Sequence, residues 1–207
     1  MRVAAIAVAA GIELVTGDPL QRLVGGLGER ELLLVLDNCE HLVTAIAPVM
    51  AAVAIAVKLD SKGPVLFRQK RYGFNNELIS VFKFRSMYTD RCDAAAAKLV
   101  TKDDPRVTKV GRFIRKTSLD ELPQLLNVAR GDMSVVGPRP TLAYQVERYD
   151  DRQRRRLEVR PGLTGLAQVS GRNALSWPDR IELDVKYVEQ HSLALDLSIL
   201  ARTAKAL

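Results

Sequence analysis

Two adjacent carboxylates, Asp120 and Glu121, stand where the sequence predicts the start of a helix. Ser118 precedes Glu121 by three residues, the spacing of a capping box, which predicts a helix that begins at Leu119. Pro123 favours a slightly later start, because proline is best tolerated in the first turn of a helix. Either start places Asp120 and Glu121 at the positive end of the helix, where ionised carboxylates are favoured. A carboxylate in this position can bind a divalent cation or attack a phosphorus atom. A capped surface helix without chemistry is the competing interpretation of these residues alone.

Basic side chains accompany this acid pair along the chain. Arg115 lies shortly before Asp120, and Arg139 follows it between two prolines that fix the surrounding backbone. Lys83 and Arg85, two residues apart in an alternating segment, are expected on one face of a strand. Guanidinium and ammonium groups bind phosphate oxygens, so these four cations are candidates for a phosphate or diphosphate site. Each of them also fits an ordinary solvated surface or a rigid loop.

Charge is distributed unevenly over the chain. Residues 1–57 contain three basic and six acidic residues, whereas residues 58–207 contain 28 basic and 18 acidic residues, a net charge of +10. A basic body favours an anionic partner, such as a phosphorylated substrate, an anionic membrane surface or nucleic acid. Aromatic residues make up only 5% of the chain, which leaves little base stacking and argues against nucleic acid. The two cysteines and two histidines fit no zinc-ligand spacing and no Ser-His-Asp triad.

Residues 42–57 form an apolar segment without any charged residue. Its length corresponds to about 24 Å of helix, shorter than the ~20 residues that span a bilayer. Pro48 removes one backbone donor and is expected to bend the segment. A buried core helix and a re-entrant or interfacial membrane helix both fit this pattern. Lys58 and Lys62 follow at once, which favours contact with anionic lipid head groups.

The rest of the chain reads as a mixture of short elements. Alternation predicts a β-hairpin with arms within residues 63–73 and 78–87. Helices are expected within residues 90–102, 119–127, 144–160, 179–191 and 195–207. Glycine-rich residues 161–173 predict turns that let the backbone approach a ligand. These patterns predict an α+β fold that is mainly helical with a short β-hairpin.

The first 45 residues have a different character. The apolar run that ends at Asp37 is typical of a buried parallel strand. The stretch Leu-Leu-Val-Leu-Asp-Asn-Cys-Glu-His-Leu is similar to part of the ATPase domains of large bacterial transcriptional regulators. The chain contains no Gly-x-x-x-x-Gly-Lys-Ser/Thr phosphate loop, so we predict no nucleotide chemistry for this fragment.

Several motifs of the basic body occur in one order: Gly-Pro-Val-Leu-Phe-Arg-Gln at 63–69, Lys-Phe-Arg-Ser-Met at 83–87, Arg-Lys-Thr-Ser-Leu-Asp-Glu-Leu-Pro-Gln at 115–124, Gly-Pro-Arg-Pro at 137–140, Arg-Pro-Gly-Leu-Thr-Gly at 160–165 and Gly-Arg-Asn at 171–173. In this order they resemble the bacterial sugar transferase family, the monotopic polyprenyl-phosphate phosphoglycosyl transferases, over about residues 45–207. The resemblance implies a membrane-associated α+β fold with a re-entrant helix, at the cytoplasmic face of the bacterial inner membrane. It implies an undecaprenyl-phosphate sugar phosphotransferase that uses Mg²⁺. Such an enzyme moves a sugar-1-phosphate from a UDP-sugar to undecaprenyl phosphate, releases UMP and initiates exopolysaccharide, capsule or O-antigen assembly.

The resemblance also implies roles for individual residues. Asp120 matches the nucleophile that forms a phosphosugar-aspartyl intermediate and contacts the metal, and Glu121 matches its assisting acid. Arg115 and Arg139 match arginines that bind phosphate, and Arg172 matches an arginine near the nucleotide.

Lys83 and Arg85 complete the candidate substrate-binding residues. The expected organisation is a regulator-like fragment over 1–44, one arm of the re-entrant helix over 45–58, and a catalytic domain over 59–207. The alternatives are a non-catalytic basic module that binds anions or nucleic acid, and an inactive fusion product. Attack by a carboxylate on a diphosphate brings negative charges together, so cations beside the acid pair agree with the enzymatic interpretation.

Overall fold

The computed structural model describes residues 39–91, 100–101, 103–171 and 174–206 of the chain. The predicted N-terminal strand, most of the helix expected within residues 90–102, and Arg172 lie outside these described residues.

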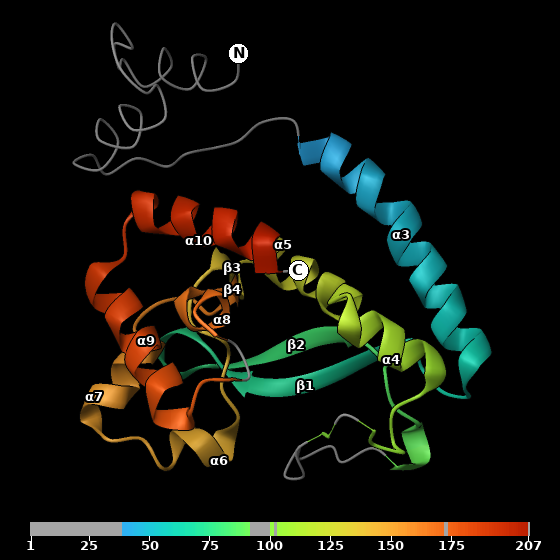
Figure 1. Ribbon diagram of the computed structural model, residues 1–207, viewed down its shortest axis with the longest axis horizontal. Helices are drawn as coiled ribbons and strands as arrows, with labels where there is room; N and C mark the ends of the chain where they lie inside the picture. The colour runs from blue at the N-terminus through green and yellow to red at the C-terminus, as the bar shows by residue number, and fades with distance from the viewer. Residues whose placement is uncertain (1–38, 92–99, 102, 172–173, 207) are drawn as a thin grey trace, which may run out of the picture.

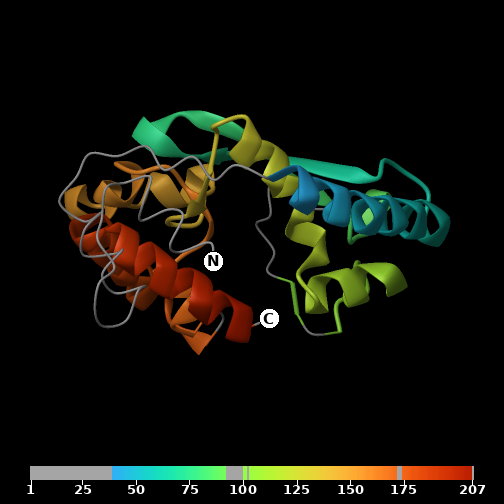
Figure 2. The same ribbon diagram turned by 90° about the horizontal axis from the view of Figure 1, so that it is seen from above.

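Helices and 3-10 helices (α and η) and strands follow one another in this order: α3 Cys39–Asp60, β1 Leu66–Tyr72, η1 Phe74–Asn76, β2 Leu78–Phe84, η2 Thr89–Arg91, α4 Lys109–Lys116, η3 Leu119–Gln124, α5 Leu125–Ala129, β3 Ser134–Val136, α6 Ala143–Val146, α7 Asp151–Arg154, η4 Arg155–Leu157, β4 Gly162–Thr164, α8 Leu166–Val169, α9 Trp177–Gln190 and α10 Leu193–Ala206. Figure 1 shows α3 along one side of the molecule, the β1–β2 hairpin across the middle, and α9 and α10 on the opposite side. From above, the hairpin runs along one edge between these two groups of helices (Figure 2). The predicted α+β fold with a short hairpin is confirmed.

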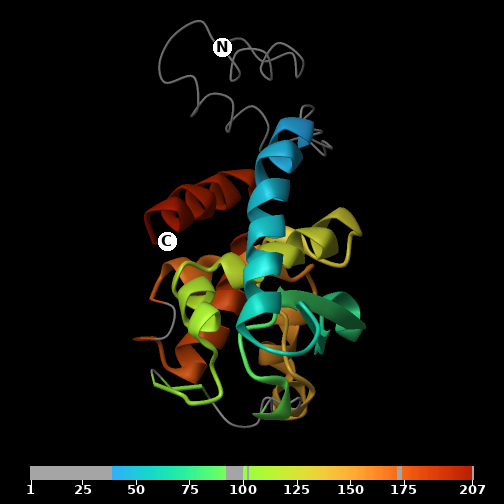
Figure 3. The same cartoon turned by 90° about the vertical axis from the view of Figure 1, so that its right-hand side faces the viewer.

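Helix α3 is continuous through Pro48, where the sequence predicts a bend. A proline removes one hydrogen bond of a helix, and apolar packing of the following turns offsets that loss. Val53 and Val57 of α3 are buried against Phe84 and Ile114, in a core between α3, the hairpin and α4. Figure 3 shows the amino-terminal end of α3 projecting beyond this core.

Helix α3 also crosses both boundaries that the sequence suggested, between residues 44 and 45 and between residues 58 and 59. The division into domains therefore stays a prediction. Among the helices within the described ranges, none combines the length and the apolar character needed to cross a membrane.

The hairpin confirms the predicted alternation. Strands β1 and β2 are antiparallel, and Phe67 faces Lys83 across the pair. The strands are joined through Asn75 and Asn76, which adopt the left-handed conformation at φ 53° and 61°. Asparagine tolerates this conformation better than most residues, and the turn thus fixes which side chains of β2 share a face.

A second sheet, which the sequence analysis did not predict, joins β3 to β4 in parallel. Its strands are very short, and they meet where Gly137 follows β3 and Gly162 begins β4. A Cβ added to Gly162 would lie 2.1 Å from the Gly137 nitrogen, so neither strand could approach the other with a larger residue there. The glycine-rich segment therefore approaches the Gly-Pro-Arg-Pro backbone. The expectation that it also approaches a ligand stays a prediction.

The C-terminal helices agree with the predicted pattern. Helices α9 and α10 form as expected, and Tyr187 and Ile199 from them are buried with Val136 of β3. The expected helix within residues 144–160 is instead three short pieces, α6, α7 and η4, broken at Asp150, which caps α7 through its side chain.

Candidate active site

The acid pair lies in the 3-10 helix η3, at the end of a sharp turn from α4. Ser118 adopts the left-handed conformation, with φ 57° and ψ 12°, and its side chain makes no cap hydrogen bond. The predicted capping box is therefore wrong, because an N-cap residue needs an extended conformation to aim its hydroxyl at the helix. The 3-10 helix η3 begins at Leu119, the earlier of the two starts that the sequence allows, and the α-helix α5 follows from Leu125.

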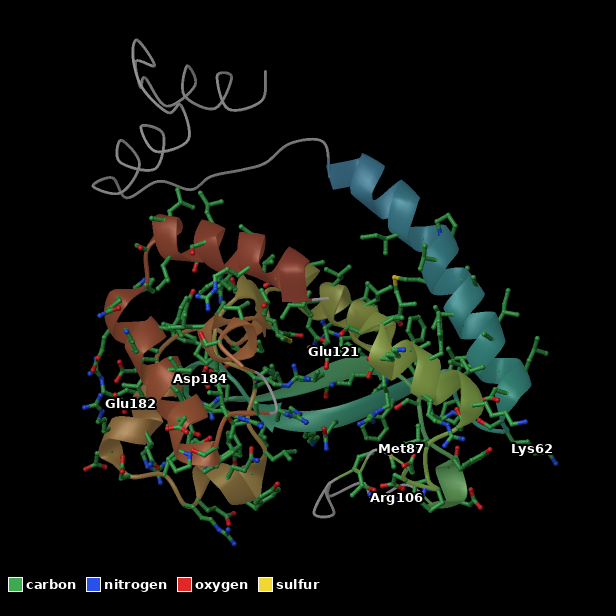
Figure 4. All side chains as sticks on the ribbon, in the orientation of Figure 1. Lys62, Met87, Arg106, Glu121, Glu182 and Asp184 are labelled. Carbon is green, nitrogen blue, oxygen red and sulfur yellow. The ribbon has the colours of Figure 1, made fainter. Side chains whose placement is uncertain are left out.

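Glu121 is held by two cations from other parts of the chain. Lys83 Nζ of β2 donates to Glu121 Oε1 at 2.8 Å, and Arg139 donates through Nη1 to Oε2 at 3.3 Å and through Nη2 to Oε1. Figure 4 shows Glu121 near the centre of the molecule, beside the hairpin. Burial raises the pKa of Glu121, but Arg139 and Lys83 outweigh this effect and hold the pKa well below its usual range. Glu121 is thus a fixed anion that orients both cations.

Asp120 has the opposite environment. It is 9% exposed, and no donor among the described residues makes a hydrogen bond or ion pair with its carboxylate. Burial raises the pKa of Asp120, although the nearby charge of Lys83 opposes the shift. Two neighbouring carboxylates whose pKa values are pushed apart suit two different chemical roles. Here one is tied into ion pairs, and the other is left available for a reaction or a cation.

A third cation joins the site from β1. Arg71 donates through Nη1 to the Pro140 carbonyl oxygen at 2.8 Å and through Nη2 to Gln69 Oε1 at 2.8 Å. Burial and the charge of Arg139 lower the pKa of Arg71 to about 10, and the same two causes lower the pKa of Lys83 to about 8. Arg139 thus destabilises two neighbouring cations, while Glu121 raises the pKa of Arg139 itself. A polyanion would stabilise the cations of such a partly buried site.

The family is identified by comparison with known proteins. The model of the family described as "Bacterial sugar transferase" matches residues 35–207. The chain belongs to the bacterial sugar transferase family. Among the relatives of this sugar transferase is an uncharacterized sugar transferase of Bacillus subtilis, 50% identical over 149 residues, with 72% of each chain covered.

Two further relatives of this sugar transferase carry names that state a reaction. The "UDP-glucose:undecaprenyl-phosphate glucose-1-phosphate transferase" of Caulobacter vibrioides is 43% identical over 202 residues, which cover 92% of this chain and 73% of that protein. The "Undecaprenyl-phosphate glucose phosphotransferase" of Komagataeibacter xylinus is 49% identical over 179 residues, which cover 79% of this chain. The chain spans 33% of the length of the Komagataeibacter relative. The predicted family membership is confirmed, and the family match begins ten residues before the predicted boundary at 45.

Two other predicted site residues of this sugar transferase, Arg115 and Arg85, make no direct hydrogen bond or ion pair with the carboxylates of the acid pair in the described part of the chain. Arg115 of α4 is exposed and donates to Ser86 Oγ at 3.4 Å, and its charge acts on Asp120. Arg85 is buried and donates to the carbonyl oxygens of Pro64 at 2.6 Å and Ser61 at 2.8 Å. Ser61 and Pro64 belong to the segment after α3, and Arg85 also donates to Val57 within α3, whereas Lys83 contacts the acid pair.

Lys83 and Arg85 have different binding partners, and the expectation that they share one face of the strand stays a prediction. Arg172 lies outside the described residues.

Sequence reasoning missed Arg71 although a signal for it existed. In β1, Phe67, Gln69 and Arg71 alternate onto one face, and Phe67 pairs with Lys83. Side chains that face one another across an antiparallel pair lie on the same side of the sheet. The hairpin register therefore assigns Arg71 and Lys83 to the same face.

Mg²⁺ prefers oxygen ligands, and the acid pair offers carboxylate oxygens. Within the described ranges, no group of three or more His, Cys, Asp or Glu side chains is placed to hold a metal. Mg²⁺ commonly binds one or two carboxylates together with substrate phosphates and water. Asp120 makes no ion pair with a described residue, so its carboxylate could bind Mg²⁺ together with substrate phosphates and water. The carboxylate of Glu121 already forms ion pairs with Lys83 and Arg139.

Proposed function

We propose that this sugar transferase moves a sugar-1-phosphate from a UDP-sugar to undecaprenyl phosphate and releases UMP, the step that initiates exopolysaccharide, capsule or O-antigen assembly. The names of the Caulobacter and Komagataeibacter relatives support this reaction and make UDP-glucose the first donor to test. The observation that carries the proposal is the contrast within the acid pair. Asp120 is buried and has no hydrogen-bond or ion-pair partner within the described part of the chain, while Glu121 forms ion pairs with Lys83 and Arg139.

In the proposed first step, a carboxylate oxygen of Asp120 attacks the phosphorus atom that bears the sugar. The bond from this phosphorus to the oxygen that bridges the two phosphates breaks, and UMP leaves with that oxygen. In the second step, an oxygen of undecaprenyl phosphate attacks the same phosphorus atom. The bond to Asp120 breaks, which restores the carboxylate and yields the lipid-linked diphosphate sugar.

The cations offset the negative charge that gathers during both steps. Arg139, Lys83 and Arg71 lie beside the carboxylates and are already oriented before a substrate binds, which is the arrangement that stabilises a phosphoryl-transfer transition state. Asp120 would hold a Mg²⁺ ion, which would supply further positive charge at the site. Glu121 contributes by holding two of the cations in place.

We further propose that the outward face of α3 rests on the cytoplasmic leaflet of the bacterial inner membrane, where the lipid substrate resides. Pro48, Ala52, Ile55 and Leu59 recur at helical spacing and are exposed, with Ile55 61% and Leu59 81% exposed. Val53 occupies the opposite, buried face. An exposed apolar stripe beside basic residues is the pattern of a helix that lies in a membrane interface.

The test is UMP release by the detergent-solubilised chain with undecaprenyl phosphate, Mg²⁺ and a panel of UDP-sugars. Release with one donor, lost in Asp120→Asn and kept in the control Asp103→Asn, is the expected result, because Asp103 is an exposed carboxylate outside the site. Full activity of Asp120→Asn would exclude the aspartyl intermediate. No release from any donor would reject the proposed reaction for this chain.

A further inference from the structure

A buried ion pair links α9 to the segment that carries Arg139. Arg156 and Asp184 are 6% and 2% exposed, and Arg156 Nη2 donates to Asp184 Oδ2. Arg156 Nη1 donates to the hydroxyl group of Tyr149. Figure 4 shows Asp184 further inside the molecule than Glu182, which stands two residues before it on the same helix.

The same guanidinium also holds the active-site backbone. Arg156 Nη2 donates to the backbone carbonyl oxygen of Arg139 at 3.1 Å. Arg139 is flanked by two prolines, which have no N–H group, so its segment is fixed mainly through carbonyl oxygens. The Pro138 oxygen accepts from Gly162 N at 2.8 Å, and the Pro140 oxygen accepts from Arg71 Nη1 at 2.8 Å. Arg156 supplies the donor for the residue between them.

The buried ion pair between Arg156 and Asp184 is poorly suited to stabilise the fold. Within the part of the chain that the structure describes, Arg156 Nε and Asp184 Oδ1 are buried without a hydrogen-bond partner. A buried ion pair with unmet polar atoms often contributes no more to folding than apolar residues of the same volume. The presence of the Arg156–Asp184 ion pair is then better explained by the backbone geometry that the pair fixes. The fixed geometry here is that of the Arg139 backbone, whose side chain binds Glu121.

We propose that Arg156, anchored by Asp184, is a positioning residue that fixes the Arg139 backbone. The guanidinium group of Arg139 can then bridge Glu121 and a bound diphosphate. Asp184 neutralises Arg156 and sets its direction, and Tyr149 holds the other end of the guanidinium group. The identity of the diphosphate ligand rests on the proposed function. The contact between Arg156 and Arg139 does not.

The first experiment measures the affinity of the solubilised full chain for inorganic pyrophosphate by calorimetry, together with kcat and KM for UMP release. Asp184→Asn keeps the shape of the pair but removes its charge, and we expect pyrophosphate affinity to fall about tenfold, as for loss of one charge-assisted hydrogen bond. The matched control is Glu182→Gln, which breaks the exposed Arg152–Glu182 ion pair between α7 and α9 and should leave affinity unchanged.

A second comparison separates positioning from stability. In an Arg139→Ala background, Asp184→Asn should cause no further loss of affinity, because the group that it positions is gone. A full additional loss in that background, or an unchanged affinity in the single variant, would overturn the proposal. Trp177, the only tryptophan of the chain, stacks on Tyr149 with ring centroids 6.4 Å apart and reports by fluorescence whether this region is folded.

Arg156→Lys decides the question if Asp184→Asn does not fold. A lysine keeps the charge but cannot direct separate N–H groups at Asp184, Tyr149 and the Arg139 carbonyl oxygen. We expect the same fall in pyrophosphate affinity, and an affinity equal to that of the wild type would reject the role of Arg156. If the wild type binds pyrophosphate but releases no UMP, the proposed transfer fails, and the affinities of the variants still decide the positioning role.

Discussion

Lys83 donates a hydrogen bond to Glu121 at 2.8 Å, although 38 residues separate them in the sequence. This contact joins the hairpin to the 3-10 helix that carries the acid pair. It fixes the ammonium group beside Asp120 as well, since Asp120 and Glu121 are adjacent. The electrostatic character of the site therefore depends on how β2 packs against η3.

Lys83 gives the site a defined pH dependence. Burial and Arg139 lower the pKa of Lys83 to about 8, while Glu121 opposes the shift and Arg71 adds to it. We expect turnover to fall as the pH rises above about 8, because Lys83 loses its charge. The unfolded chain keeps this lysine protonated up to its ordinary pKa, near 10.4. Stability from this group should therefore rise with pH between these values while activity falls.

The measurement for Lys83 combines pH–rate profiles with chemical unfolding at each pH. Lys83→Arg, which stays charged, should move the alkaline fall of activity to higher pH. An alkaline limb that is identical in Lys83→Arg and the wild type would mean that another group controls it.

The two carboxylates should respond in opposite directions to neutralisation. Asp120→Asn removes a buried carboxylate that has no partner among the residues that the structure describes, so the free energy of unfolding should stay equal or rise while turnover falls by about 10⁴-fold or more. Glu121→Gln leaves Lys83 and Arg139 without their counter-charge and should lower the free energy of unfolding by about 2 kcal/mol. Thermal unfolding and UMP release measure both effects. Equal destabilisation by the two variants would contradict the assigned environments.

Gly162 is expected to tolerate no side chain. A Cβ at this position would lie 2.1 Å from the nitrogen of Gly137, so Gly162→Ala must separate β3 from β4 and displace the segment of Arg139. We expect a loss of about 3 kcal/mol in the free energy of unfolding, as for other overpacked positions, and a loss of activity. Gly73→Ala is the control, since its added methyl group meets only side-chain atoms, at 3.3 Å or more. A wild-type melting temperature for Gly162→Ala would refute this account.

The apolar stripe of α3 should control membrane binding. Ile55→Asp and Leu59→Asp place charges on the outward face, and we expect both to reduce co-sedimentation with vesicles of anionic phospholipid by about tenfold or more. Leu78→Asp is the control, because Leu78 is 55% exposed but lies on the hairpin. Thermal unfolding should change little in all three variants. Binding that drops equally in the control would show that negative charge alone explains the effect.

The sequence by itself determined the chemical groups and most of the local elements. Alternation predicted the hairpin, and helical spacing predicted α9 and α10. The order of short motifs identified the family, which the family match confirms. These features are readable because strand and helix periods, turn residues and prolines act over a few neighbouring residues. A signal was missed for Asp184 as well as for Arg71: Asp184 falls three residues after Ile181 and one before Val185, on the buried stripe of α9.

Only the tertiary structure decided which carboxylate of the acid pair forms ion pairs and which has no partner among the described residues. The sequence suggested a capping role for Glu121, but Lys83 and Arg139, 38 and 18 residues away, bind it instead. The parallel β3–β4 pair and the hold of Arg156 on Arg139 likewise join segments that are distant in the chain. Burial and through-space charge set the pKa of each group, and both arise from packing between elements. A residue type and its near neighbours therefore specify what a side chain can do, and the folded surroundings decide what it does.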